Sequence, residues 1–269
     1  MKSFGRWLLW IVLAGVALQL FFVARIALML VIAPESTAFM RSEAWRIAEQ
    51  RLDGERNWQW SAEWVPYDKI SPNLKRAVMA SEDAGFTSHG GVDWDAIQAA
   101  WEKNEKRQAI AERAAARRAE REARLAARAK KAPTSNAAPS AANSKPVKVV
   151  GGSTITQQLA KNLLLSGERS LLRKGQELVL TLMLEALLSK QRILEIYLNS
   201  VEWGNGVFGA EAAAQRYFKK SASQLSPREA ARLAVMLPSP KFFENRQGSA
   251  YLTRRTNVIV ARMNDVGPP

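Results

Sequence analysis

A long apolar run near the N-terminus constrains this chain more than any other feature. Residues 7–24 read WLLWIVLAGVALQLFFVA, where Gln19 is the only strongly polar residue, and the run resumes after Arg25 as IALMLVIA before Pro34. As a helix rising about 1.5 Å per residue, the first stretch alone nearly crosses a hydrocarbon core of roughly 30 Å. A core helix usually has a polar face, and a secretory signal would have a shorter apolar core and then a cleavage site of the Ala-x-Ala kind, which does not occur near this run. We therefore expect one transmembrane anchor over residues 7–33.

The charges around this run predict its orientation. Lys2 and Arg6 precede it, so the positive-inside rule places the N-terminus in the cytoplasm and the chain after residue 34 on the outer side. Arg25 would lie near the outer interface, where its side chain can reach the headgroups.

A tryptophan-rich stretch, residues 34–66, follows the anchor. Trp45, Trp58, Trp60 and Trp64 lie within it among polar and charged residues. Tryptophan prefers the boundary between lipid and water, so the stretch is expected to lie at the membrane surface. The alternative is that the rings fill the seam between anchor and domain, and the sequence leaves both open.

Composition excludes several kinds of site. There is no cysteine, which rules out disulfides, thiol nucleophiles and Cys-ligated metals, and a single histidine, His89, rules out a multi-histidine metal site. Of the formal charge of +14, a net +9 lies between residues 103 and 148, leaving only +5 for the remainder. Because a nucleic-acid-binding domain carries its charge on the folded face that docks, we expect no nucleic-acid partner.

The remainder, residues 67–269, has a helical pattern and predicts an all-α domain. Ser71-Pro72 and Ser226-Pro227-Arg228-Glu229 are helix starts, and residues 171–188 are apolar on nearly every side, which predicts a buried central helix. Residues 103–148 interrupt this domain with an Ala/Arg/Glu-rich segment followed by a Pro/Ser/Asn-rich linker. We interpret them as an insertion that is a solvated charge run, or alternatively a segment attracted to anionic lipid or RNA.

Two blocks flanking the insertion carry polar residues that a helical scaffold does not need. In the first, Glu82 and Asp83 end a helix, where the helix dipole disfavours negative charge. In the second, glycines and the hydroxyl of Ser153 open a helix whose backbone N–H groups could bind phosphate.

Four blocks then occur in a characteristic order. They read Glu82-Asp83-x-x-Phe86-x-x-His89-x-Gly91-x-Asp93, Gly152-Ser153-Thr154-Ile155-Thr156-Gln157-Gln158-x-x-Lys161-Asn162, Arg173-Lys174-x-x-Glu177 and Lys190-x-x-Ile193-Leu194-Glu195-x-Tyr197-Leu198-Asn199. This series resembles the signatures of the peptidoglycan glycosyltransferases, which are membrane enzymes that polymerise lipid II. No Ser-x-x-Lys occurs, so the chain resembles the monofunctional members, which lack the transpeptidase half.

The resemblance implies a lysozyme-like helical fold and a division of roles. Glu82 would be the catalytic base that activates the 4-hydroxyl of lipid II, and Lys161, Arg169 and Arg173 would hold the departing diphosphate. Glu177 would be the second essential glutamate, orienting the diphosphate or a divalent ion (Mg²⁺ or Mn²⁺) bridged through it; its alternative is an ion pair with Arg173. No tightly bound cofactor is implied.

The remaining residues have supporting roles in this interpretation. Ser153, Gln157 and Gln158 would contact sugar or phosphate, and Asp83 would secure its loop by hydrogen bonding. His89 is expected to be structural, as are Glu195, Tyr197 and Asn199. The insertion 103–148 falls where members of the family have a mobile loop.

The resemblance also implies partners and a location. These are lipid II, the nascent glycan strand, the membrane and proteins of a cell-wall synthesis complex, with a single-pass anchor in the bacterial inner membrane and a periplasmic catalytic domain. A lysozyme-like hydrolase is the rival enzyme. Cationic motif residues would lower a glutamate's pKa, whereas hydrolysis needs a protonated acid, so we expect transfer. A membrane scaffold that uses the basic insertion is the non-enzymatic alternative.

Overall fold

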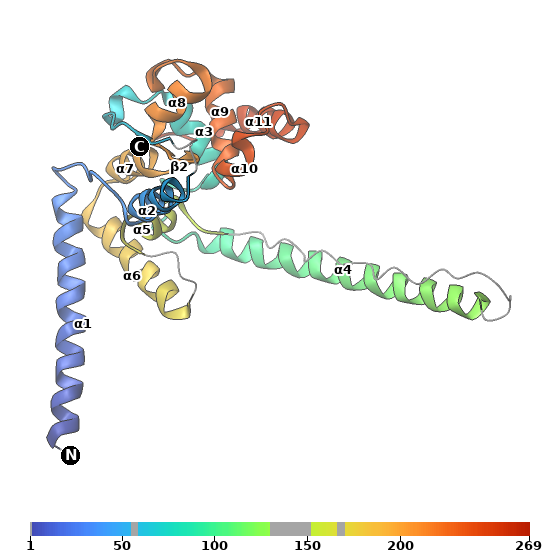
Figure 1. The fold of residues 1–269 in the computed structure, drawn as a ribbon, viewed down its shortest axis with the longest axis horizontal. Coiled ribbons are helices and arrows are strands. Elements are labelled where there is room, and N and C mark those ends of the chain that lie inside the picture. Colours follow the sequence, from blue (N-terminus) through green and yellow to red (C-terminus); the bar gives the residue numbers. More distant parts are fainter. Residues whose placement is uncertain (1, 55–58, 130–151, 166–169) are drawn as a thin grey trace. The chain divides into compact units, whose positions relative to one another are not determined.

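The computed structural model describes residues 2–54, 59–129, 152–165 and 170–269 (Figure 1). These form two compact units, one made of Met1–Val92 with Ser153–Pro269 and the other of Asp93–Gly152. The first unit, the catalytic body, carries the blocks singled out above apart from Gly152 and Asp93. It is helical, as predicted.

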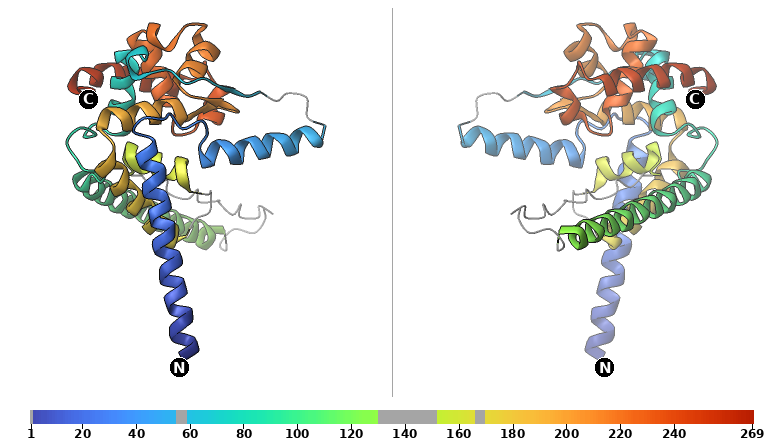
Figure 2. Two further views of the ribbon diagram at one scale, coloured as in Figure 1. Left: turned by 90° about the vertical axis from the view of Figure 1, so that its left-hand side faces the viewer. Right: turned by 90° about the vertical axis from the view of Figure 1, so that its right-hand side faces the viewer.

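The first helix, α1 (Lys2–Leu28), extends away from helices α8 to α11 with the N-terminus at its far end (Figure 2). Its segment Phe4–Leu28 is long and apolar enough to cross a membrane. The helix ends five residues before the end of the predicted span, and the turns that follow it contain the buried Met29. Ile26 is also fully buried, so the last turn of α1 belongs to the core of the body.

Helix α6 (Leu171–Leu187) packs beside α1 and corrects one prediction. It is not a buried central helix: Leu180 and Leu184 are buried, but several large apolar side chains are exposed, namely Leu171, Leu172, Leu178, Val179 and Leu182. A helix that is apolar all round is suited either to a protein core or to lipid, and the pattern does not separate the two. Two side-chain amides join the helices, since Gln19 and Gln176 donate to one another over 3.1 and 3.3 Å.

Helix α2 (Ala38–Leu52) follows the anchor and begins at Thr37, whose hydroxyl accepts from the N–H of Met40. The tryptophans of this region differ in their surroundings. Trp45 on α2 is exposed, and so is Trp60, whose ring lies tilted beside that of Phe208 with the ring centroids 4.9 Å apart. Trp64 packs against the core beneath the guanidinium of Arg192, so it fills the seam, while Trp58 lies outside the described residues.

The centre of the body is formed by α3 (Pro72–Glu82), α9 (Pro227–Met236) and α11 (Ala250–Arg262). Both predicted helix starts are present, because Ser71 caps α3 and Ser226 forms a capping box with Glu229 on α9. Leu74 and Val78 of α3 are fully buried, and α9 presents small side chains that permit close helix packing, namely Ala230, Ala231 and Ala234. This packing fixes the end of α3, where Glu82 lies.

A small sheet went unpredicted. Its strands are β1 (Ser61–Ala62), β2 (Glu202–Gly204) and β3 (Val207–Phe208), with β3 in the middle, parallel to β1 and antiparallel to β2. Strands of two or three residues are too short for an alternating pattern. The turn between β2 and β3 requires glycine at 206, where φ is +69° and an added Cβ would lie 2.0 Å from the carbonyl oxygen of Gln59.

The other elements of the body complete the fold around these parts. They are η1 (Tyr67–Lys69), α5 (Ile155–Leu164), α7 (Lys190–Ser200), α8 (Ala210–Phe218), η2 (Ala222–Gln224), α10 (Pro240–Glu244) and η3 (Met263–Asp265). Helices α5, α6 and α7 pack against one another and carry three of the four sequence blocks.

The described part of the second unit consists mainly of one long helix, α4 (Trp94–Ala129). Its described side chains are almost all exposed, including Ile110 and Leu125, the two large apolar residues of the basic segment. Glu120 and Arg124 form the expected pair one turn apart, 2.5 Å between Oε1 and Nη2. The segment 130–148 of the predicted insertion lies outside the described residues.

Candidate active site

Glu82 is the last residue of α3, and its carboxylate is held from two sides. Gln158 on α5 donates from Nε2 to Oε2 over 3.2 Å, and the hydroxyl of Ser81 donates to Oε1 over 3.2 Å. The buried hydroxyl of Tyr197 on α7 donates to Oε1 of Gln158 over 2.9 Å. Because a hydroxyl donor fixes the oxygen end of this amide, its N–H₂ end must face Glu82.

The pKa of Glu82 is raised above its usual range because burial removes water from the carboxylate. The hydrogen bonds from Gln158 and Ser81 and the charge of Arg255 on α11 oppose this shift, and the charge of Asp83 adds to it. The direction is opposite to our expectation, since desolvation outweighs the cationic neighbour. The pKa therefore does not distinguish a transferase from a hydrolase.

Asp83 is buried beside Glu82 and secures the loop, as predicted. It accepts from the backbone N–H of Ile155 over 2.9 Å and contacts Nε2 of His89 at 2.9 Å. Nδ1 of His89 accepts from the N–H of Gly91 over 3.1 Å, so the hydrogen-bond pattern assigns the ring proton to Nε2. His89 therefore has the structural role expected of it.

The start of α5 differs from the predicted phosphate cradle. Thr154, not Ser153, caps the helix, and Gln157 completes a capping box in which its side-chain oxygen accepts from the N–H of Thr154. The N–H of Ile155 is taken by Asp83. The anion that this helix start attracts is thus the protein's own carboxylate, because Asp83 is adjacent in space. Ser153 is exposed and Gln157 is buried in the cap.

Glu177 on α6 is buried between two cations of its own helix. Arg173 donates to Oε2 over 3.0 Å, which is the ion pair considered as the alternative role, and Lys174 pairs with Oε1. Two cations neutralise this carboxylate, so it is a poor direct ligand for a divalent ion. Nε of Arg173 is buried and has no hydrogen-bond partner among the described residues, which leaves one guanidinium donor to serve an anionic ligand.

A cavity of about 440 Å³ brings these parts together. Gln158 and Lys161 of α5 line it, as do Arg173 of α6 and Tyr197 of α7. Gln158 also bonds Glu82, so the carboxylate is one hydrogen bond away from a space that two of the three predicted diphosphate-binding cations line. The third, Arg169, lies outside the described residues. We refer to this cavity as the cleft.

The remaining wall of the cleft could not be foreseen. It is formed by α2 through Phe39 and Ser42 and by Val201, Glu202, Leu237 and Pro240. Apart from their tryptophans, residues 34–66 contain no sequence feature that predicts a place in the wall of the cleft. Tyr197 was expected to be scaffold, and Glu195 and Asn199 do have that role, since they hold the backbone of Tyr67 and Val65. Arg255 belongs to none of the four blocks.

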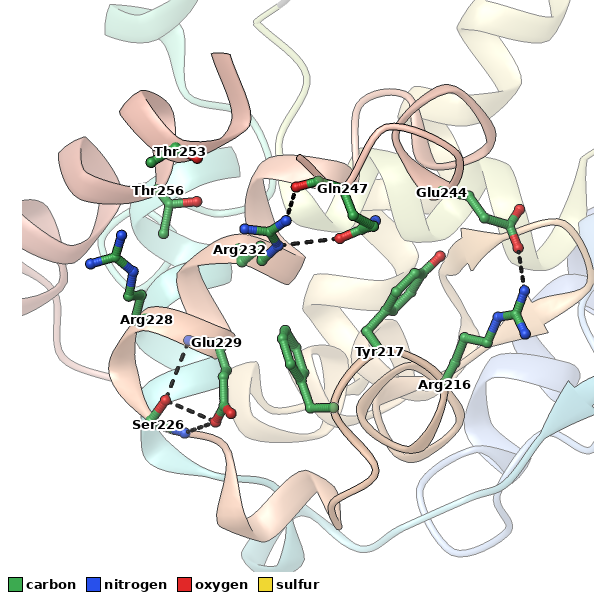
Figure 3. Close-up of a pocket in the computed structure, with 11 residues that line it drawn as sticks. Arg216, Tyr217, Ser226, Arg228, Glu229, Arg232, Glu244, Gln247, Thr253 and Thr256 are labelled. Carbon is green, nitrogen blue, oxygen red and sulfur yellow. Dashed lines mark hydrogen bonds and ion pairs between the residues drawn. The ribbon is translucent and has the colours of Figure 1, made fainter. Parts of the chain in front are cut away.

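A second, larger cavity of about 670 Å³ lies among α8, α9, α10 and α11 and is lined by none of the predicted site residues (Figure 3). Its carboxylates are engaged in the fold: Glu229 in its capping box and Glu244 with Arg216, 3.4 Å apart. The guanidinium of Arg232 donates hydrogen bonds to the side-chain oxygen and to the backbone carbonyl of Gln247. The cleft, not this cavity, is the candidate active site.

Comparison with known proteins identifies the family of the chain. A family model described as Transglycosylase matches residues 49–115 and 133–264. Biosynthetic peptidoglycan transglycosylases of three bacteria are similar over nearly their whole length. The protein of Burkholderia thailandensis is 49% identical over 266 residues, covering 97% of this chain and 88% of the relative. For Paraburkholderia xenovorans the identity is 47% over 262 residues (96% and 92%), and for a Janthinobacterium species 45% over 273 residues, with both chains covered completely. The chain belongs to the transglycosylase family.

Proposed function

We propose that the cleft polymerises peptidoglycan glycan strands with Glu82 as the base and a cationic wall as the diphosphate site. Membership of the family makes the chain a peptidoglycan glycosyltransferase, so lipid II and the glycan strand are its substrates. The observation that supports the assignment of roles is the position of Gln158, which bonds Glu82 and lines the same cavity as Lys161 and Arg173.

In the proposed reaction, the 4-hydroxyl oxygen of lipid II attacks the anomeric carbon of the lipid-linked chain. A carbon–oxygen bond forms to the acceptor, the bond from that carbon to the diphosphate oxygen breaks, and the configuration inverts. The hydroxyl proton passes to Glu82, and the electron pair leaves with undecaprenyl pyrophosphate. Because a diphosphate is a good leaving group, one base and a cationic site are sufficient, and no general acid is required.

The cationic wall would consist of Lys161, Arg173 and Arg169. The unpartnered Nε of Arg173 supports this assignment, because it is a buried donor that a diphosphate oxygen would satisfy. Glu177 then holds Arg173 and Lys174 in place. A divalent ion, if used, would associate with the diphosphate and not with Glu177 directly, and we infer no tightly bound cofactor.

The other predicted contacts fall into supporting roles. Gln158 would orient Glu82 and meet the sugar, whereas Gln157, Ser153 and Asp83 fix the start of α5 under it. We further propose the topology indicated by Lys2 and Arg6, with the N-terminus cytoplasmic and the body periplasmic, anchored in the inner membrane. Proteins of a cell-wall synthesis complex are proposed partners, and nucleic acid is not.

Incubation of the full chain with labelled lipid II in detergent micelles tests the proposal. Glycan polymer and free undecaprenyl pyrophosphate are expected, and a parallel reaction with chelator tests the divalent ion. Release of short fragments from finished glycan without polymer would instead identify a hydrolase. Loss of cell-wall function on removing 103–148, with polymerisation intact, would favour the scaffold alternative.

A further inference from the structure

Glu202 is a buried carboxyl in the wall of the cleft that the proposed reaction does not use. It is the first residue of β2, only 8% of its surface is exposed, and it lines the cleft beside Val201. Two neighbouring elements, α2 and α10, contribute Ser42 and Pro240 to the same wall. The carboxyl therefore shares the cleft wall with α2, β2 and α10, and helices α5 and α6 line the same cleft with the proposed diphosphate-binding cations Lys161 and Arg173.

One oxygen of this carboxyl lacks a hydrogen bond. Oε1 of Glu202 is buried and has no hydrogen-bond partner among the described residues. Nζ of Lys241 lies 3.4 Å from it, within ion-pair distance but without hydrogen-bond geometry. The same ammonium donates a hydrogen bond to Glu43 on α2 over 2.6 Å, so its ion pair with Glu202 is the weaker of the two. A buried acceptor without a donor is costly, and Glu202 lines a cavity in which a ligand could supply the donor.

We propose that Oε1 of Glu202 accepts a hydrogen bond from a sugar hydroxyl or acetamido N–H of the substrate in the cleft, which makes Glu202 a substrate-binding residue. This inference rests on the proposed function. An anionic ligand group is unsuited to this position, because the negatively charged carboxylate of Glu202 would repel it. The diphosphate is expected to bind Lys161 and Arg173. A neutral O–H or N–H donor both satisfies the oxygen and is abundant on an amino sugar.

The protonation state of Glu202 offers a separate readout. Burial is the largest cause that raises its pKa to about 7, the charge of Glu43 raises it further, and Lys241 and a backbone hydrogen bond at Gly206 lower it. These groups face it from α2, α10 and the β2–β3 turn. Because the ionised carboxylate is the stronger acceptor, substrate affinity is expected to increase as pH rises through about 7.

A purely structural role makes a different prediction. Glu43, Lys241 and Glu202 form an ion cluster that joins α2 to α10 and β2. If Glu202 served only this cluster, its replacement would lower the free energy of unfolding and leave the KM for lipid II unchanged.

The experiment compares E202L and E202Q with the parent chain, with steady-state polymerisation of labelled lipid II at several pH values and thermal unfolding of each variant. E202L removes the acceptor and should raise the KM by about tenfold with a much smaller change in kcat, as expected for a lost hydrogen bond to a charged group. E202Q retains a neutral acceptor, so it should recover most of the affinity and lose the pH dependence of KM near 7.

The matched control is E211Q, because Glu211 is also a buried glutamate but bonds Ala222 and Ser221 outside the cleft. It should lose stability without a change in KM. A folded E202L with the parent KM would overturn the inference, as would a loss confined to kcat. If E202L fails to fold, a step in KM near pH 7 that persists in E202Q would overturn it. Failure of the parent chain to polymerise lipid II would instead reject the proposed function.

Discussion

The amide of Gln158 lies 3.2 Å from the carboxylate of Glu82 and donates a hydrogen bond to it. Because Tyr197 holds the other end of that amide, three helices determine how the proposed base is oriented. A base oriented by a buried network is ready to accept a proton without rearrangement. The first two predictions follow from this relationship.

Replacement of Glu82 by Gln should abolish polymerisation and preserve the fold. A general base contributes about a hundredfold to ten-thousandfold, so the rate should fall by at least about a hundredfold. Because burial raises the pKa of Glu82, its ionised form is disfavoured in the folded state, and a neutral amide should leave the melting temperature unchanged or higher. Lipid II turnover and thermal unfolding measured together test this. More than a tenth of the parent rate in a folded E82Q would contradict the assigned role.

Q158L should move the acidic limb of the pH–rate profile to higher pH. The hydrogen bond from Gln158 lowers the pKa of Glu82, so its loss adds to the shift caused by burial. The base works in its ionised form, and activity therefore rises as pH increases through the pKa of Glu82. The measurement is kcat/KM across the pH range. Q224L, at an exposed residue of η2, is the control and should not move the limb, and an unmoved limb in Q158L would refute the link.

Asp83 should be required for stability more than for proton transfer. D83A leaves the N–H of Ile155 and the ring of His89 without their acceptor, and two buried donors left unpaired predict a loss of about 2–4 kcal/mol in the free energy of unfolding. D83N keeps one acceptor oxygen and should lose less. Chemical denaturation measures this, with D53A at an exposed residue as control. Equal stability of D83A and the parent would show that the contacts contribute nothing.

The helical blocks were predictable because they depend on local signals. Ser71 and Ser226 predict the helix starts that follow them, because N-capping depends on only a few neighbouring residues. The family signatures likewise pointed to Lys161 and Arg173, which line the cleft, and to Glu82, which is hydrogen-bonded to the lining residue Gln158.

The features that escaped prediction depend on contacts distant in sequence. Glu202 and Ser42 meet in one wall because β2 and α2 are brought together by the fold, and neither carries a local mark of that position. The start of α5 was predicted to bind phosphate, but Asp83, 72 residues earlier, occupies the N–H of Ile155. The exposed leucines of α6 escaped for another reason, since an apolar pattern does not reveal which apolar surroundings it faces.

Gln19 and Gln176 should behave as a coupled pair. Each donates to the other, so Q19L or Q176L alone leaves one amide unpaired in apolar surroundings, with a loss of about 0.5–1.5 kcal/mol. The double variant removes both amides, so its loss should be smaller than the sum of the two single losses. Unfolding of the full chain in micelles, as a double-mutant cycle, measures the coupling. Strictly additive losses would show that the amides act independently.

Deletion of residues 103–148 should leave polymerisation largely intact. The described part of this segment belongs to a helix in a unit separate from the catalytic body, and its side chains are almost all exposed, so the deletion removes none of the described residues that line the cleft. Its net charge of +9 is expected to remain solvated, so binding of the protein to anionic vesicles should also change little. Lipid II turnover and vesicle sedimentation of the deleted and full chains test both statements, with E82Q introduced into the deleted chain as the inactive control. If the deleted chain still unfolds cooperatively but makes no polymer, the insertion takes part in the reaction. If only vesicle binding is lost, the insertion contributes to binding of the membrane surface.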